Sequence, residues 1–105
     1  MERTRKYQLR RYTIEDGALE KFARTWMRVI PPIRRAYGFE VHGSWLVKES
    51  NQFVWIVSFP ESYAGEFEAA ERRYLDAPDR HEAWPDPKSQ IVRTDVETMV
   101  SAAEA

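Results

Sequence analysis

Two short hydrophobic runs joined by a polar connection constrain the fold of this chain more than any other feature. They lie between Phe39 and Phe59, in a segment that reads FEVHGSWLVKESNQFVWIVSF. β-branched and aromatic residues of this kind are typical of strands. The connection, residues 49–51, is polar and ends in Asn, which suits a tight hairpin. The segment therefore predicts two antiparallel strands, 39–48 and 52–59.

The two predicted strands differ in the composition of their faces. Strand 52–59 is hydrophobic on both faces, which is typical of a strand that is covered twice. In strand 39–48, strict alternation predicts Trp45 on one face and His42 and Ser44 on the opposite face. We expect helices of the same chain to cover one side of the hairpin and a partner molecule to cover the other.

The composition is that of an ordinary globular domain. Of the 105 residues, 43% are hydrophobic and 31% are charged, and sixteen basic against seventeen acidic side chains leave a formal net charge of −1. Nucleic-acid-binding domains usually carry a marked basic surplus, so we expect no nucleic-acid partner. We expect residues 1–105 to form one domain, with residues 101–105 as a frayed tail.

What the sequence lacks disfavours several kinds of site. There is no cysteine, which excludes disulfides and cysteine-based metal sites. No hydrophobic run approaches the roughly 20 residues of a membrane span, and the N-terminus lacks the hydrophobic stretch of a signal peptide. We therefore expect a cytoplasmic protein with no membrane partner, no bound metal and no cofactor.

A first strand over 6–14 precedes a segment with helical periodicity. Asp16 is the expected N-cap of this helix and Gly38 the residue that ends it. Hydrophobic residues recur there every three or four positions, which predicts one buried stripe. The stripe contains Leu19, Phe22, Trp26, Val29, Ile33 and Tyr37.

Two consecutive prolines, Pro31 and Pro32, interrupt this helical pattern. A proline in a helix interior removes a hydrogen bond and costs about 3 kcal/mol or more. We therefore expect a kink or a break near Val29 and Ile30, which can open a gap between the helix and the sheet.

The residues after the hairpin predict a second helix over 63–75 and a short third helix that ends at Trp84. Ser62 and Asp76 are the expected N-caps of these two helices. The periodicity places Glu71 on the solvent-exposed side of the second helix.

The order of the predicted elements indicates a fold class. Residues 91–100 alternate between hydrophobic and polar and predict a final strand. The order is then β-α-β-β-α-β, the ferredoxin-like plan of an α+β protein, in which an antiparallel four-stranded sheet carries its helices on one face. The other sheet face would expose a hydrophobic patch in a monomer. We therefore expect a homodimer that forms through this sheet face.

Several short motifs, in their order and spacing, resemble the NIPSNAP domain. They are Y-x-L-R-x-Y at Tyr7, Leu9, Arg10 and Tyr12, Gly17, Phe22 and Trp26, Pro31-Pro32, Gly38-Phe39, Gly43-x-Trp45, and Asn51-x-Phe53-Val54-x-Ile56. The resemblance extends from Tyr7 to about Val96, and segment 80–85 departs from the family pattern. It implies a dimeric α+β barrel but no settled reaction, since the superfamily includes cofactor-free monooxygenases, haem-degrading enzymes and proteins that only bind a ligand.

His42 is the candidate catalytic residue. An imidazole titrates near pH 6.5 and can act as a base toward an acidic organic substrate. The alternative is a structural strand histidine that is hydrogen-bonded or half-exposed. His81 lies in a charged segment and is expected to be plain surface.

Aromatic and basic side chains form the candidate ligand-binding set. Aromatic walls suit planar ligands, and arginines can hold an anionic group through paired hydrogen bonds. The set consists of Arg10, Tyr12, Trp26, Tyr37, Trp45, Trp55 and Tyr74. Arg11 and Arg34 are further candidates for holding an anion.

Three functions remain open at this point. The first is a homodimer that binds a small hydrophobic or aromatic ligand between sheet and helices. The second is a cofactor-independent monooxygenase or isomerase that acts on an aromatic substrate with His42 as base. The third is a structural dimer module without a pocket.

Overall fold

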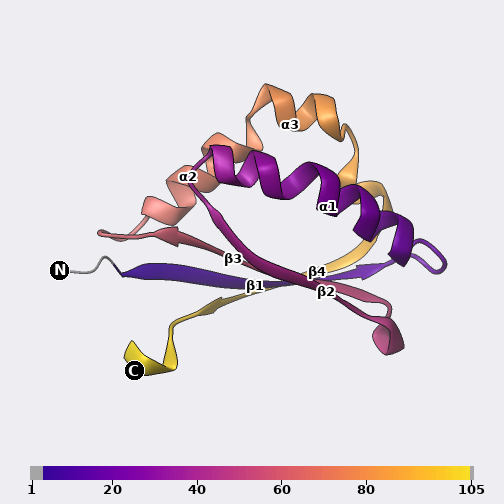
Figure 1. Cartoon of the computed structure of the whole chain (residues 1–105), viewed down its shortest axis with the longest axis horizontal. Coiled ribbons are helices and arrows are strands. Elements are labelled where there is room, and N and C mark those ends of the chain that lie inside the picture. Colours follow the sequence, from indigo (N-terminus) through magenta and orange to yellow (C-terminus); the bar gives the residue numbers. More distant parts are fainter. Residues whose placement is uncertain (1–3, 105) are drawn as a thin grey trace.

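The computed structural model describes residues 4–104 and has the predicted ferredoxin-like α+β architecture (Figure 1). In chain order the elements are β1 (Arg5–Ile14), α1 (Leu19–Ala36), β2 (Glu40–Val47), β3 (Gln52–Pro60), α2 (Glu66–Leu75), α3 (Pro78–Ala83) and β4 (Ile91–Met99). Three short 3-10 turns, Lys48–Ser50, Pro87–Gln90 and Ala102–Glu104, accompany them. The four strands form one antiparallel sheet in the order β2-β3-β1-β4.

The helices lie on one side of the sheet, and the core fills the space between the two layers (Figure 1). Alternate residues of β3, Phe53, Trp55 and Val57, are almost completely buried and face the helices. α1 and α2 add their predicted hydrophobic stripes, including Phe22, Trp26, Phe67 and Tyr74. No α-helix in the described part of the chain lies on the other face of the sheet, which we call the open face.

Helix α1 continues through Pro31 and Pro32, so a break near Val29 and Ile30 is wrong, whereas a kink there stays a prediction. The prolines remove two backbone hydrogen bonds. However, the stripe of buried side chains runs across them, from Trp26 to Arg34. Burial of this stripe against the sheet outweighs the local cost, because tertiary packing contributes most of the stability of a protein helix.

The three predicted N-caps, Asp16, Ser62 and Asp76, are also wrong. The helices follow Ala18, Gly65 and Ala77, and none of these residues makes a side-chain cap hydrogen bond. At α2, Glu61 acts instead of Ser62, since its carboxylate accepts a hydrogen bond from the amide of Phe67 at 2.9 Å. At α3, Pro78 at the start of the helix has no amide to cap.

A β-bulge at His42 changes the alternation of β2. Val41 pairs with Val57 and Gly43 with Ile56, so His42 is an extra residue on β2. The predicted opposition of His42 and Trp45 is therefore wrong, because both side chains lie on the open face. Ser44 lies on the helix side, where its hydroxyl contacts Met27 Sδ at 3.0 Å.

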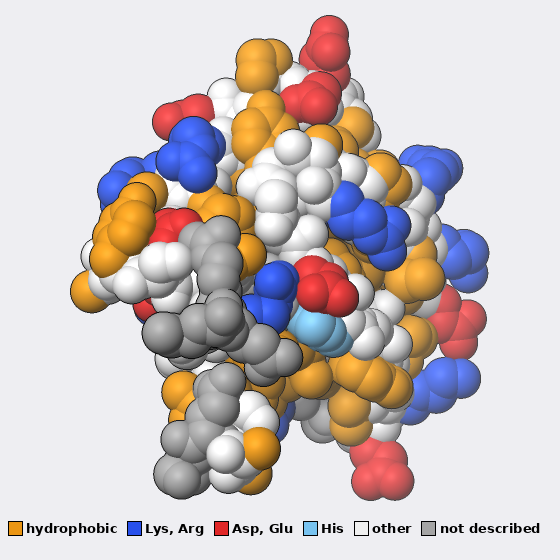
Figure 2. All heavy atoms as spheres, turned by 60° about the vertical axis from the view of Figure 1, so that its left-hand side comes forward, with side chains coloured by type: hydrophobic (Ala, Val, Ile, Leu, Met, Phe, Trp, Pro, Cys, Tyr) orange, Lys and Arg blue, Asp and Glu red, His pale blue; other side chains and the backbone are white. Residues whose placement is uncertain are grey.

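The open face combines a hydrophobic centre with charged pairs at one edge. β1 and β3 contribute Leu9, Val54 and Ile56, and Trp45 of β2 is 49% exposed. On the β4 side, ion pairs join Arg11 to Glu97 and Arg93 to Asp95. Figure 2, which views one end of the molecule, shows hydrophobic side chains interspersed with both signs of charge. Within residues 4–104, no helix is long and apolar enough to cross a membrane.

Candidate functional site

A cavity of about 360 Å³ lies between the helices and the β1–β4 side of the sheet. Its walls come from β1, α1, β3, α2, α3, β4 and the segment that leads into β4. Six aromatic side chains line it: Tyr12, Phe22, Trp26, Trp55, Tyr74 and Trp84. Five charged side chains also line it: Arg10, Arg34, Glu71, Arg80 and Lys88.

The aromatic walls are held by ring-to-ring contacts. Trp26 and Trp55 pack edge to face with centroids 5.0 Å apart, and Tyr12 contacts Trp55 in the same way at 6.4 Å. Trp84, after α3, packs on Phe22 of α1 at 5.2 Å. The interlocked rings come from two helix or loop segments and two strands, so they form a preorganised apolar surface.

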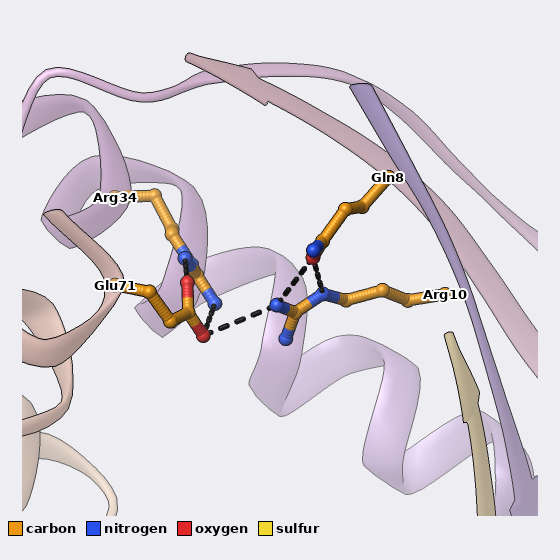
Figure 3. Close-up of polar contacts among 4 residues, drawn as sticks. All are labelled: Gln8, Arg10, Arg34 and Glu71. Carbon is orange, nitrogen blue, oxygen red and sulfur yellow. Dashed lines mark hydrogen bonds and ion pairs between the residues drawn. The ribbon is translucent and has the colours of Figure 1, made fainter. Parts of the chain in front are cut away.

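Glu71 of α2 joins two arginines at one wall of the cavity (Figure 3). Both nitrogens of the Arg34 fork donate to its carboxylate, with distances of 2.5 and 3.2 Å. Arg10 Nη2 donates to the same carboxylate at 3.1 Å, and Arg10 also donates to Gln8. This geometry fixes three charged side chains from α1, α2 and β1 relative to one another.

Burial and neighbouring groups shift the pKa values of Glu71 and Arg10 in opposite directions. Burial alone would raise the pKa of Glu71, but the hydrogen bonds and charges of Arg34 and Arg10 lower it below its usual value. For Arg10, burial would lower the pKa, but Tyr12 and Glu71 raise it above its usual value. Glu71 and Arg10 therefore carry their charges at neutral pH.

Arg34 is buried in an aromatic setting and is only 2% exposed. Its guanidinium carbon lies 3.8 Å from the ring centroid of Tyr74, 4.7 Å from that of Phe39 and 5.2 Å from that of Trp55. Arg80 approaches the Tyr74 ring as well, at 5.3 Å. Cation–π contacts of this kind position guanidinium groups without neutralising them.

Three buried donors at this site have no hydrogen-bond partner among the residues that the structure describes. They are Arg34 Nε, Trp55 Nε1 and Arg80 Nε, and all three residues line the cavity. Buried donors are normally satisfied, so such a group calls for an explanation. A bound molecule with acceptor atoms would provide one.

Five of the seven predicted ligand-binding residues line the cavity: Arg10, Tyr12, Trp26, Trp55 and Tyr74. Tyr37 is not part of the wall but packs edge to face on Tyr74, with centroids 6.3 Å apart. Trp45 lies on the open face, away from the cavity. Their roles in binding remain predictions.

The two further arginine candidates lie on opposite sides of the sheet. Arg34 lines the cavity, whereas Arg11 points to the open face and pairs with Glu97. The sequence reasoning misplaced Glu71, whose side chain is 18% exposed and faces the cavity rather than solvent. It also did not single out Arg80. The periodicity of one helix does not show which side chains of other elements lie beside it. It could therefore not have identified either residue as part of the site.

His42 lies on the open face and not at the cavity. Its Nε2 atom is hydrogen-bonded to Ser58 Oγ at 2.6 Å, and its ring is 5.3 Å from that of Tyr7. Arg5 Nε also donates to Ser58 Oγ. The sheet separates His42 from any ligand in the cavity, so a catalytic role for it would require a substrate on the open face. His81 is exposed on α3.

Two other hollows are wide and open to solvent. One, of about 570 Å³, runs along α1 beside Met27 and Leu46, and the other, of about 680 Å³, lies at the β2–β3 turn beside Trp45 and Val54. Charged side chains also line them: Glu20, Arg24 and Arg28 in the first, and Lys48 and Glu49 in the second. Within residues 4–104, no three His, Cys, Asp or Glu side chains gather as metal ligands would.

Comparison with known proteins identifies the family. The NIPSNAP family model matches residues 7–104, nearly the whole chain. The chain belongs to the NIPSNAP family. A search of curated proteins gives no match for it.

Solved structures similar to this NIPSNAP protein share its fold at low sequence identity. A NIPSNAP family protein of unknown function from Agrobacterium tumefaciens is 18% identical with a TM-score of 0.80, over 97% of this chain and 92% of that one. An uncharacterised NIPSNAP domain protein from Burkholderia xenovorans is also 18% identical, with a TM-score of 0.78 over 95% and 97%. A protein proposed to be an antibiotic biosynthesis monooxygenase, from Nitrosomonas europaea, is 6% identical with a TM-score of 0.70 over 97% and 94%. At these low sequence identities, the likeness shows a shared fold and says nothing about activity.

Proposed function

We propose that this NIPSNAP protein binds a small planar aromatic compound in the cavity between the helices and the sheet. The observation that carries the proposal is the cavity itself, about 360 Å³ with six aromatic side chains in its wall. This volume lies within the range of about 300–1,000 Å³ that small-molecule sites occupy. A compound with one or two fused rings fits within it.

The character of the walls favours binding over a purely structural role. A domain that served only as a dimer module would gain stability from a filled core, because interiors are normally close-packed. Here Trp26 and Trp55 are at most 2% exposed, and yet both border an open space. The cavity also brings together charged groups from different elements, and sites typically combine apolar walls with a few placed polar groups.

The enzymatic alternative has less support in this chain. Its candidate base, His42, lies across the sheet from the cavity, next to Ser58 and Tyr7. The likeness to a protein proposed to be a monooxygenase concerns the fold, which hosts many functions. We therefore assign binding, and no reaction, to the cavity.

A cavity-blocking substitution tests the proposal. Thr94 of β4 lines the cavity, and Thr94→Phe places a ring at its wall. Thr98 lies four residues further along the same strand, on the same face but outside the cavity lining, so Thr98→Phe is the matched control. We expect isothermal titration calorimetry to show binding of 2-naphthamide or 2-naphthoate to the wild type, a loss of about tenfold or more in affinity for Thr94→Phe, and little change for Thr98→Phe.

Two results would overturn the proposal. The first is that neither compound binds the wild type at millimolar concentration. The second is that Thr94→Phe, with an unchanged circular dichroism spectrum, binds both compounds as tightly as the wild type does. Binding in that case would occur outside the cavity.

A further inference from the structure

We infer that the ligand of this cavity is an aromatic carboxylate whose carboxylate group is held by Arg80. The inference rests on the proposed function and narrows it to one class of compound. It follows from the distribution of charge in the cavity wall, from the unpartnered donors and from the shape of the guanidinium group.

The charges in the cavity wall do not balance. Glu71 is the acidic residue of the lining, and its single negative charge is shared by Arg34 and Arg10. Arg80 and Lys88 also line the cavity, and neither has an acidic partner there among the residues that the structure describes. The wall therefore has an excess of positive charge, which attracts an anion into a space with otherwise apolar walls.

Arg80 is the arginine of this group that remains available to a ligand. Its described hydrogen bond is a long one, from Nη1 to the backbone oxygen of Leu75 at 3.4 Å, and its Nε is buried without a partner. Contact with the Tyr74 ring, at 5.3 Å, holds the guanidinium at the cavity. By contrast, both fork nitrogens of Arg34 are already engaged by Glu71.

The remaining unpartnered atoms match an acceptor-only group. Trp55 Nε1 and Arg34 Nε are donors and cannot accept. A carboxylate has two oxygens with about four acceptor positions, so it can accept a bidentate pair from one guanidinium and a further hydrogen bond. Trp55 is 1% exposed, so bulk water does not satisfy its indole N–H.

A singly charged planar acid suits the site better than a phosphate does. Arg80 offers one planar fork, which has the geometry of a carboxylate. Glu71 keeps its negative charge nearby and would repel a dianion more strongly than a monoanion. The aromatic walls then contact the ring to which the carboxylate is attached.

A pair of compounds with the same ring system, one a carboxylate and the other a neutral amide, tests this inference. 2-Naphthoate and 2-naphthamide share their ring system, and the amide lacks the charge. Hydrogen bonds to charged groups contribute more than neutral ones, so we expect the wild type to bind 2-naphthoate about tenfold more tightly than 2-naphthamide by calorimetry. In Arg80→Gln this preference should fall to about twofold or less, because the affinity for 2-naphthoate falls more than the affinity for 2-naphthamide does.

Two further variants define the role of Arg80. Arg80→Lys keeps the charge without the fork and should retain part of the preference. Arg73 is an exposed arginine on α2 outside the cavity lining, so Arg73→Gln should retain all of it. Thermal unfolding of each variant verifies that it is folded.

The outcomes separate this inference from the proposed function. Equal binding of the two compounds to the wild type, or a preference that persists in folded Arg80→Gln, would overturn the inference and leave the cavity as a binding site. Absence of binding of both compounds would overturn the proposed function and, with it, the inference. A charge preference that disappears in Arg80→Gln and persists in Arg73→Gln supports it.

Discussion

At the scale of single residues, Glu71 decides whether the charges of the site can be buried. Arg34 is 2% exposed, and its two fork nitrogens find their acceptors on this one carboxylate. The helical period of α2 placed Glu71 among exposed charged residues. That period could not reveal arginines that approach from α1 and β1, because a pattern within one helix contains no information about its neighbours.

We predict that Glu71→Gln strongly destabilises the fold. The substitution leaves the buried Arg34 without a counter-charge, and breaking a buried ion pair in this way costs roughly 3–5 kcal/mol. Urea denaturation followed by circular dichroism measures the loss. The matched control is Glu68→Gln on the same helix, where an exposed ion pair to Lys6 is removed and little change is expected.

The effect should depend on pH in a defined direction. The pKa of Glu71 is lower in the folded protein than the usual value of about 4.3. A carboxyl of this kind contributes its full stabilisation above the unfolded pKa and loses it as the pH falls through the folded pKa. The difference in unfolding free energy between wild type and Glu71→Gln should therefore be constant near neutral pH and shrink below about pH 4. A difference that grows on acidification would contradict the assigned charge state.

At the scale of secondary-structure elements, α1 and β2 show where local rules fail. The two prolines of α1 predicted a break in the helix. The helix is continuous because burial of its hydrophobic stripe outweighs the local cost of the prolines. In β2, strict alternation held up to Val41 and then failed, because one extra residue at His42 reverses every later side chain. Gly43, directly after this bulge, has a φ of +146° and a Trp45 ring above it.

We predict that Gly43→Ala destabilises the protein by about 1–3 kcal/mol. A Cβ at this position would lie 2.8 Å from the Trp45 ring, in a backbone conformation that side chains rarely adopt. The denaturation midpoint in urea measures the effect. Part of the cost should disappear in a Trp45→Ala background, where the ring is absent. If Gly43→Ala destabilised the wild type and the Trp45→Ala variant equally, the destabilisation would come from the backbone conformation alone.

At the scale of the whole molecule, the order and type of the elements were predictable because their hydrophobic periods are long and distinct. The sheet order follows from the ferredoxin-like plan and is observed. The cavity was predictable only as an aromatic region. Five residues of the predicted set line the cavity. Trp45 lies on the open face because of the bulge at His42, and the local sequence pattern does not predict that bulge.

The open face carries our prediction about assembly: we propose that the protein forms a symmetric dimer through it. Leu9, Val54 and Ile56 form a hydrophobic centre that soluble monomers rarely leave exposed. Light scattering coupled to size exclusion should give a dimer at micromolar concentration. Ile56→Glu should shift it to the monomer, and Tyr63→Glu, at a residue that is 67% exposed outside the sheet, should not. A stable wild-type monomer would contradict the proposal.

The most direct test of the central claim is a crystal structure of the protein grown with 2-naphthoate. We expect the naphthalene ring between α1 and the sheet, in contact with Trp26 and Trp55, and the carboxylate at Arg80. A ring bound on the open face beside His42, or a cavity filled by side chains with no compound in it, would contradict the claim that this cavity is the functional site.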